Sequence, residues 1–597
     1  MFTPTIKEYT TTSRIFFHDH LDTEFRAFQK NVAAMLTKEF SLSHGMAFMN
    51  LTHDMWTNAN NDNLLGTSIR LIDSDFKIVT LAVLLSKNNV SHAADFNGTF
   101  IILRFLENYH LDIERYTKFV TSDTTPSAKN VADYIGDAEQ VDCEMHVLNL
   151  CMLYGLGLRE NTQTKNEIVD GKKMKVQRVV TPGGEFKGGL KLVEQFRKLP
   201  KYFASTQKKE ILKKIQDSQG LPVGIPSLDG KTRVASCHKL FRTTIYHKKS
   251  LEAFYSRMDS YGQDDDFLEI WDGISDNDWD TVRQIEVILE MIATYTKSEA
   301  QSSSVVTCSY TIYFRYLCRK FMEMDSMDVI DDQQFKKGQA INDGKKSPTY
   351  VADFTSDAKL CLERTKLQMK KRFKEEDCLN NCLPVFMDPR TAAYAGKIIQ
   401  NVGLYEDAKK EIMGRHREVF RKISENESKI SVQRAAQRPR TRPVTSIVRS
   451  NAFDDMETML NPIDETPEDE MTEDSLDLKA DAIFEEWLLR CGKIKWSRFR
   501  IDGTDTSAPL NSLLDLYVFA DPLLWLKREG KQLFPSIALL ARITLARCDN
   551  GAFQESVFSS AAGTMNIHQT KMDTGQFEKR ALLFHNKKFV AKNIHYI

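Results

Sequence analysis

The chain has 597 residues, of which 42% are hydrophobic and 27% are charged, and its formal net charge is −1 at pH 7. A near-zero net charge excludes a global attraction to DNA, so any contact with nucleic acid must come from local patches. No apolar run reaches the ~18 residues of a membrane-spanning helix, residues 1–17 lack a signal-peptide core, and the 10 Cys are scattered. We therefore expect a soluble intracellular protein of several domains.

The first 160 residues alternate between strand and helix patterns. The predicted order is a strand from Met46 that ends at Asp54, strands over 68–72 and 78–85, a helix over 95–110, a strand over 118–122 that ends at Asp123, and a helix that starts at Thr125-Pro126. Three strands, a helix, a strand and a helix form the opening of an RNase H-like fold. The predicted class is therefore α/β (α+β), with a mixed sheet flanked by helices.

Two aspartates mark the ends of the first and fourth predicted strands. A right-handed crossover between parallel strands brings their carboxyl ends to one edge of the sheet, so Asp54 and Asp123 are expected to lie close together. Two such carboxylates repel each other unless a divalent cation bridges them, and that arrangement suits two-metal phosphoryl transfer. Either Asp alone is more often a simple strand terminator, and Asp73, Asp95 and Asp142 are alternatives that the pattern leaves open.

The segment after residue 160 is basic and then mainly helical. Residues 168–180 predict a hairpin around Asp170-Gly171, and the surrounding Lys and Arg residues are interleaved with aromatics, which suits DNA-backbone tracking or, equally, a solvated face. Helical patterns continue to about Ile423. Five residues separate Gly338 from Gly344 where a phosphate loop has four, so no nucleotide cofactor is expected.

A charged linker and a C-terminal unit complete the chain. A basic block over 434–449 and an acidic block over 454–481 predict a disordered linker. The expected domains are therefore 1–160, the first part of the core; 161–423, a helical insertion; 424–482, the linker; and 483–597, the last part of the core. In this last part a helix carries Glu555 beside an apolar stripe, and by periodicity alone Glu555 is a solvated carboxylate.

Several short motifs in a consistent order carry a family resemblance. They are Cys143, His146 and Leu148-Asn149-Leu150; Thr232-Arg233-Val234; Met387-Asp388-Pro389-Arg390; Phe534–Arg542; and Glu555–Gly563. The order of these motifs resembles that of hAT superfamily transposases, of the hobo and Activator type. The resemblance covers residues 17–589, and the BED-type zinc finger that precedes the core in full-length members is not in this sequence.

The resemblance implies a DDE-type transposase that cleaves DNA and transfers strands. In that family Glu555 would be the third catalytic carboxylate and metal ligand beside Asp54 and Asp123, with two Mg²⁺ or Mn²⁺ ions as cofactors. His146 would contact the DNA backbone near the active site; on its own the Cys143/His146 pair offers too few ligands for zinc. Dimerisation through the C-terminal region and a nuclear location are also implied. The residues expected to bind DNA are His146, Lys172, Lys173, Arg178 and Arg233.

Two departures from the family pattern favour an alternative. Val234 stands where the family has a Trp that stacks on a flipped base, and Ser556 stands where it has Arg. A catalytically decayed, dimerising DNA- or chromatin-associated protein would tolerate both changes. An unrelated helical scaffold with chance motifs is the third interpretation.

Overall fold

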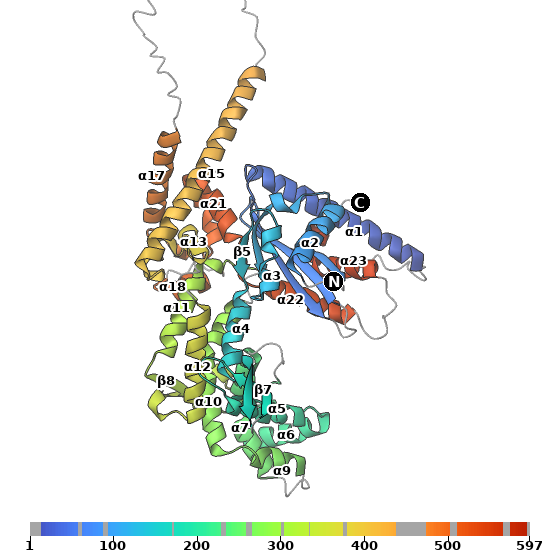
Figure 1. Cartoon of the computed structure of the whole chain (residues 1–597), viewed down its shortest axis with the longest axis vertical. Helices are drawn as coiled ribbons and strands as arrows, with labels where there is room; N and C mark the ends of the chain where they lie inside the picture. Colours follow the sequence, from blue (N-terminus) through green and yellow to red (C-terminus); the bar gives the residue numbers. More distant parts are fainter. Residues whose placement is uncertain are drawn as a thin grey trace, which may run out of the picture.

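A mixed five-stranded sheet forms the centre of the computed structural model (Figure 1), which describes residues 14–57, 63–87, 93–169, 172–228, 235–257, 265–299, 304–332, 335–373, 379–437, 473–501, 510–564 and 574–593. The strands are β1 (Met49–Thr57), β2 (Asn63–Ile72), β3 (Ile78–Lys87), β4 (Thr117–Ser122) and β5 (Glu139–Asp142), in the spatial order β3-β2-β1-β4-β5. β1 and β3 pair antiparallel with β2, whereas β4 pairs parallel with β1 and β5. The four strands expected from the sequence are present, and β5 was not expected.

One expected strand boundary is wrong. β1 does not end at Asp54 but continues to Thr57, because β2 pairs with it along that whole length, from Asn50 opposite Arg70 to Thr57 opposite Asn63. Asp54 therefore lies within β1, three residues before its last residue. Asp123, by contrast, directly follows the last residue of β4, as expected.

Helices cover both faces of the sheet, which explains why β2 and β3 are nearly continuous runs of buried residues. On one face, α22 (Ala552–Thr564) packs against β1 and β2, and α21 (Pro535–Leu545) packs against β2. On the other face lies α2 (Ala94–Tyr109), whose Asn97 amide is 3.5 Å from the Met55 sulfur. The long helix α1 (Arg14–Leu42) contacts α2 and also α23 (Thr574–His585), so both termini of the chain contribute to this unit (Figure 1).

The chain leaves the sheet through α4 (Glu144–Gly155) and builds a second, helical part with its own core. The helices that supply this core are α5 (Lys187–Tyr202), α6 (Thr206–Gln219), α7 (Ala235–Tyr255), α9 (Asp265–Asp272), α10 (Asp276–Glu299), α11 (Thr311–Met322) and α12 (Ser356–Arg372). Two small hairpins accompany them: β6 (Thr162–Val169) with β7 (Lys172–Val179), and β8 (Ser326–Ile330) with β9 (Lys346–Tyr350). The expected helical insertion is thus mainly helical, with two hairpins.

The chain returns to the sheet through α13 (Leu379–Met387), α15 (Val402–Gln437) and α17 (Glu473–Cys491). Both ends of the expected linker, 424–437 and 473–482, are helical instead of disordered, and Arg417 and Arg421 of α15 pair with Asp481 and Asp477 of α17. The intervening residues 438–472 lie outside the described residues. Among the described helices, none combines the length and apolar character required to cross a bilayer.

Candidate functional site

Asp54 and Asp123 lie at the same level on neighbouring parallel strands. The pairing of β1 with β4 ends with Thr52 opposite Thr121, and Asp54 and Asp123 each lie two residues beyond that pair. The Asp123 carboxylate is close enough to contribute to the raised pKa of Asp54. Neighbouring strands are about 4.8 Å apart, and side chains two residues apart point to the same face. The two carboxylates are therefore expected on one face, at one edge of the sheet.

Glu555 lies over that same face, in the first turn of α22. Trp56 points to the same side of β1 as Asp54, and its ring stacks on Phe558 of α22 with a centroid separation of 5.9 Å. Phe558 is three residues, or about one turn, after Glu555. The contact therefore places the start of α22, with Glu555, on the side where Asp54 projects.

A glycine makes this close packing possible. Gly66 pairs with Asp54 across β1 and β2, and a Cβ atom at Gly66 would lie 1.9 Å from Gln554 Nε2 and 2.7 Å from the Phe558 ring. Cross-strand partners present their side chains to one face, so Gly66 leaves open the space that α22 fills. Gly66 was not among the site residues expected from the sequence, although an isolated glycine within a strand pattern signals a close approach of another segment.

A buried network of hydrogen bonds around Asn50, which we call the Asn50 hub, connects the segment before α22 to β1 and β4. Asn50 Oδ1 accepts from the backbone N–H of Cys548 (3.1 Å), and the Thr121 hydroxyl donates to the Cys548 carbonyl oxygen (2.6 Å) while lying 3.0 Å from Asn50 Oδ1. The Asn50 amide also donates to Thr52 Oγ1 (3.1 Å). More than 400 residues separate Cys548 from these strands in the chain. The hub therefore fixes where α22 begins relative to Asp54 and Asp123.

The charges of Asp123 and Glu555 both act on the Asp54 carboxyl. Burial, with smaller contributions from the Asp123 and Glu555 carboxylates, raises the pKa of Asp54 to about 7, and the backbone N–H of Met55, which donates to Asp54 Oδ1 (2.8 Å), opposes the rise. Asp123 Oδ1 accepts from the backbone N–H and hydroxyl of Thr125 (2.8 and 2.6 Å). These bonds use Oδ1 of each aspartate. The result is a concentration of negative charge at one edge of the sheet.

Cys143 and His146 border the same carboxylates from the start of α4. The Cys143 sulfur accepts from the backbone N–H of Gly551 (3.3 Å), and burial, with smaller contributions from Glu555 and Asp54, raises the pKa of its thiol. Burial lowers the pKa of His146, while the nearby Asp123 opposes that shift. His146 is therefore a mainly neutral ring beside Asp123 at neutral pH.

A buried ion pair supports this end of α4. Glu144 accepts two bonds from the Arg315 guanidinium of α11, one of them 2.9 Å long from Nε. The Glu144 backbone N–H donates to the Asp549 carbonyl oxygen (2.6 Å), and Asp549 in turn pairs with Arg547 (2.6 Å) and Thr311 (2.6 Å). The helical part thus braces both α4 and the segment before α22.

The alternative aspartates have local structural roles. Asp73 Oδ1 accepts the backbone N–H groups of Asp75 and Lys77 in the β2–β3 turn, and Asp95 Oδ1 accepts from Phe96 at the start of α2. Asp142 forms an ion pair with Lys129 (2.6 Å). None of these three contributes to the pKa shift of Asp54. Asp54, Asp123 and Glu555 are therefore the carboxylates that the fold brings together.

The expected DNA-binding residues lie in different places. Lys172, Lys173 and Arg178 are on β7; Arg178 is exposed, and the side chains of the two lysines are outside the described residues, as are Arg233 and Val234. Ser556, where the family pattern has Arg, donates its hydroxyl to the Phe553 carbonyl oxygen (2.6 Å) and lies 3.3 Å from His585 Nε2. It therefore faces α23 and not the carboxylates.

The donor set at this edge suits a divalent cation. Within the described part of the chain, no group of three or more His, Cys, Asp or Glu side chains is arranged so that it could hold a metal ion as it stands. Carboxylate oxygens are nevertheless the ligands that Mg²⁺ and Mn²⁺ prefer, and a cation would favour the charged form of Asp54, whose pKa is raised by burial and, to a smaller extent, by Asp123 and Glu555. Such an ion therefore fits the chemistry of Asp54, Asp123 and Glu555. To bind it, the three side chains would have to move closer together.

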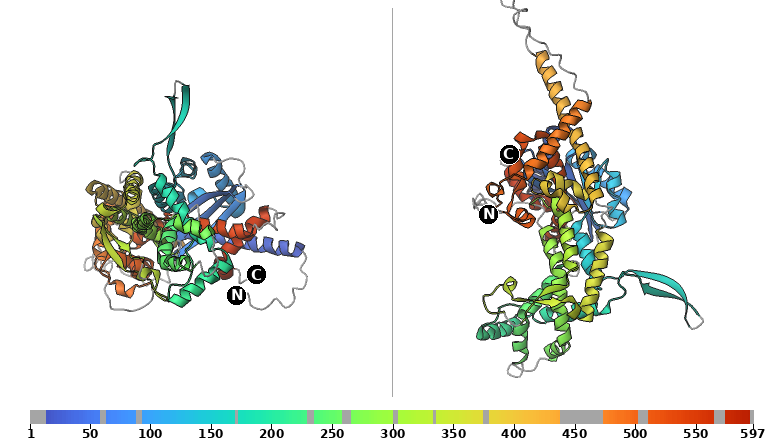
Figure 2. Two further views of the ribbon diagram at one scale, coloured as in Figure 1. Left: turned by 90° about the horizontal axis from the view of Figure 1, so that it is seen from below. Right: turned by 90° about the vertical axis from the view of Figure 1, so that its left-hand side faces the viewer.

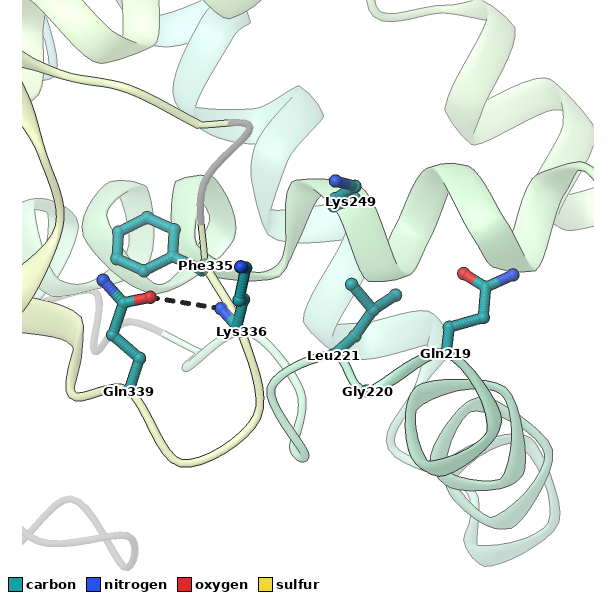
Figure 3. Close-up of a pocket in the computed structure, with 7 residues that line it drawn as sticks. All are labelled: Gln219, Gly220, Leu221, Lys249, Phe335, Lys336 and Gln339. Carbon is teal, nitrogen blue, oxygen red and sulfur yellow. Dashed lines mark hydrogen bonds between the residues drawn. The ribbon is translucent and has the colours of Figure 1, made fainter.

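A separate cleft of about 670 Å³ lies in the helical part, between the end of α6 and the 335–339 turn (Figure 3). Its lining includes Leu221, Lys249 and Phe335, and Lys336 donates its backbone N–H to Gln339 (3.2 Å). Helix α6, whose end borders the cleft, lies at the end of the molecule away from the sheet (Figure 1). It therefore has no part in the carboxylate site.

The chain was also compared with known proteins. No protein-family model matches it, and no curated protein sequence matches it either.

Proposed function

We propose that this chain is a hAT-like DNA transposase, or a protein derived from one, that cleaves DNA and transfers strands at Asp54, Asp123 and Glu555. The observation that carries the proposal is the gathering of these three carboxylates on one face of the sheet, from positions hundreds of residues apart. The strand order β3-β2-β1-β4-β5, with β1 parallel to β4, supports it as well, because an RNase H-like core requires that arrangement.

The chain's own residues have distinct roles in this proposal. Asp54, Asp123 and Glu555 would hold two Mg²⁺ or Mn²⁺ ions, which supply activation of a water or 3′-hydroxyl and neutralisation of charge on the phosphate. His146, mainly neutral beside Asp123, donates a hydrogen bond to a backbone phosphate oxygen and orients the DNA. The Asn50 hub and Gly66 position α22, so that Glu555 meets the two aspartates.

A catalytically decayed, DNA-associated descendant is the second candidate. The observation that favours it is the position of Ser556, whose hydroxyl is used within α22 and beside His585 and supplies no cation to the carboxylate edge. Such a protein would keep the fold and the dimerisation region in the nucleus but would not turn over DNA. The two candidates differ in whether the carboxylates support cleavage.

The test is cleavage of a labelled DNA oligonucleotide with Mn²⁺ by the full chain, the Asp123→Asn variant and the Asp95→Asn variant. Asp95 is exposed at the start of α2 and serves as the matched control. We expect Asp123→Asn to lower the cleavage rate by ~10²-fold or more and Asp95→Asn to leave it unchanged, since only the first removes a metal ligand. Equal rates for all three proteins would reject the nuclease assignment, and no cleavage by the unaltered chain would favour the decayed descendant.

A further inference from the structure

The β6–β7 ribbon, which comprises residues 162–169 and 172–179, projects away from the helical part into solvent. Both views of Figure 2 show it extending well beyond the neighbouring helices, on the side of the molecule where the sheet lies. The described side chains from Thr162 to Asn166 are exposed, as are Lys175, Gln177 and Arg178. Within these residues the ribbon packs neither of its faces against the body of the protein.

Several hydrogen bonds anchor the base of the ribbon. Asn161 accepts a bond from Tyr154 Oη (2.9 Å) and from the backbone N–H of Val180 (2.7 Å), and its own N–H donates to Thr181 Oγ1 (2.8 Å). The fully buried Arg364 of α12 holds Glu160 (2.9 Å) and the carbonyl oxygens of Tyr154 and Gly184. A ribbon that is held at its base and projects into solvent is suited to binding a partner.

The side chains of the ribbon are of the types that proteins use to contact nucleic acid. Residues 162–179 contain five basic and two acidic residues, in a chain whose net charge is −1. Cross-strand pairing puts Thr164 opposite Gln177 and Asn166 opposite Lys175 on one face, which we call the amide face. The other face has Gln163 opposite Arg178 and Lys165 opposite Val176. Amide and hydroxyl groups donate to and accept from base edges, whereas Lys and Arg neutralise phosphates.

The ribbon also has dimensions that fit duplex DNA. Its strands have eight residues each, which at about 3.3 Å per residue gives a length of roughly 26 Å. The major groove is about 12 Å wide and admits a two-stranded ribbon. An isolated hairpin is only marginally stable in water, so a binding partner would also complete its stabilisation.

We infer that the β6–β7 ribbon enters the major groove of duplex DNA and reads base sequence with Thr164, Asn166 and Gln177. Lys165 and Arg178, on the opposite face, reach the phosphates beside the groove. The inference rests on the proposed function for the presence of DNA, and it adds a sequence-reading arm that is separate from the carboxylate site. A protein partner or a second copy of this chain is the competing occupant.

The experiment is selection of bound duplexes from a randomised DNA library by the full chain in EDTA, followed by fluorescence anisotropy on the enriched and a scrambled duplex. We expect Thr164→Ala/Asn166→Ala/Gln177→Ala to lower the preference for the enriched duplex by ~10-fold or more, with little change on the scrambled one. The matched control, Gln163→Ala, removes an exposed amide from the opposite face and should keep the preference. Lys165→Ala should weaken both duplexes alike and lower the slope of log K against log [salt] by about 0.9.

An unchanged preference in the triple variant would overturn the inference, as would the absence of any enriched sequence with the unaltered chain. A change in molecular mass of the triple variant by light scattering, with DNA binding intact, would assign the ribbon to contact between copies instead. All the substituted side chains are exposed, and circular dichroism checks that the variants remain folded. Because binding is measured in EDTA, the outcome does not depend on cleavage, so failure of the ribbon and failure of the carboxylate site can be told apart.

Discussion

The carboxylate edge and the β6–β7 ribbon are built in opposite ways. The edge combines residues from β1, β4 and α22, held by buried hydrogen bonds between segments more than 400 residues apart. The ribbon is one contiguous hairpin whose described polar side chains are exposed, and hydrogen bonds hold its base. The first depends on the whole fold for its geometry, whereas the second depends on little beyond its own strand pairing.

This difference predicts how each region responds to substitution. Substitutions far from the carboxylates should change the positions of Asp54, Asp123 and Glu555 if they destabilise the packing of β1, β4 or α22. Changes on the ribbon should alter binding and leave folding stability almost unchanged, because exposed side chains contribute little to it. The following variants test that contrast.

The largest effect is expected at the buried ion pair below α4. Arg315→Ala leaves Glu144 buried without its partner, so we expect the free energy of unfolding to fall by roughly 3–5 kcal/mol. The matched control is Lys320→Ala on the same helix, where the pair with Glu323 is fully exposed and its loss should cost far less. Urea denaturation measures both, and equal losses would contradict the dependence of the site on its distant support.

A glycine contrast separates packing from backbone effects. Gly66→Ala forces Gln554 and Phe558 away from β2, and we expect a loss of roughly 2–3 kcal/mol together with reduced cleavage, because overpacking shifts α22 and Glu555. Gly414→Ala, in α15 with no atom within 4 Å of the added Cβ, should instead stabilise the protein by about 1 kcal/mol. Thermal unfolding measures the change in stability of both variants. An unchanged stability in Gly66→Ala would show that the position of α22 does not depend on this contact.

Removal of the Asp54 carboxyl should change the pH dependence of stability. The pKa of Asp54 in the folded chain is about 7, above its ordinary value of 3.8, so its contribution to stability is complete below pH 4 and is lost as the pH rises through 7. In EDTA, Asp54→Asn should therefore be more stable than the unaltered chain at pH 8, by roughly 2 kcal/mol. A pKa shift of three units corresponds to ~4 kcal/mol. We halve this figure because the carboxyl is partly exposed and solvent screens its charge. Parallel pH profiles for the two proteins would refute this coupling.

The smallest effect on stability is expected in the ribbon. Lys165→Ala and Lys175→Ala together should change the free energy of unfolding by less than about 0.5 kcal/mol, because both side chains are exposed. Differential scanning calorimetry without DNA provides the measurement. A clear destabilisation would mean that the ribbon packs on the body of the protein and is not a free arm.

Much of the sheet could be predicted because its signals are local. Runs of apolar residues give β1 to β4, and Asp123 follows its strand as the pattern indicates. The end of β1 could not be predicted, because pairing with β2 carries the strand past Asp54 to Thr57. The helices at both ends of the expected linker were missed for a similar reason: ion pairs such as Arg417–Asp481 between α15 and α17 stabilise sequences whose composition alone suggests disorder.

The carboxylate site is harder to predict than the ribbon. Nothing local distinguishes Glu555 from a solvated helix carboxylate, so only the family resemblance pointed to it. The Asn50 hub could not be predicted either. Asn50 and Thr121 are ordinary strand residues in the sequence, and only the folded chain brings Cys548 beside them. The basic, hairpin-forming character of 168–180, in contrast, is visible directly in the sequence.

The most direct test of the central claim is a calorimetric titration of the full chain with Mn²⁺ at pH 7.5, compared with Asp123→Asn and with the Asp95→Asn control. If Asp54, Asp123 and Glu555 form one metal-binding edge, the unaltered chain and Asp95→Asn should show the same saturable binding, and Asp123→Asn should bind at least ~10-fold more weakly. Equal binding by all three proteins, or no saturable binding by the unaltered chain, would contradict the account.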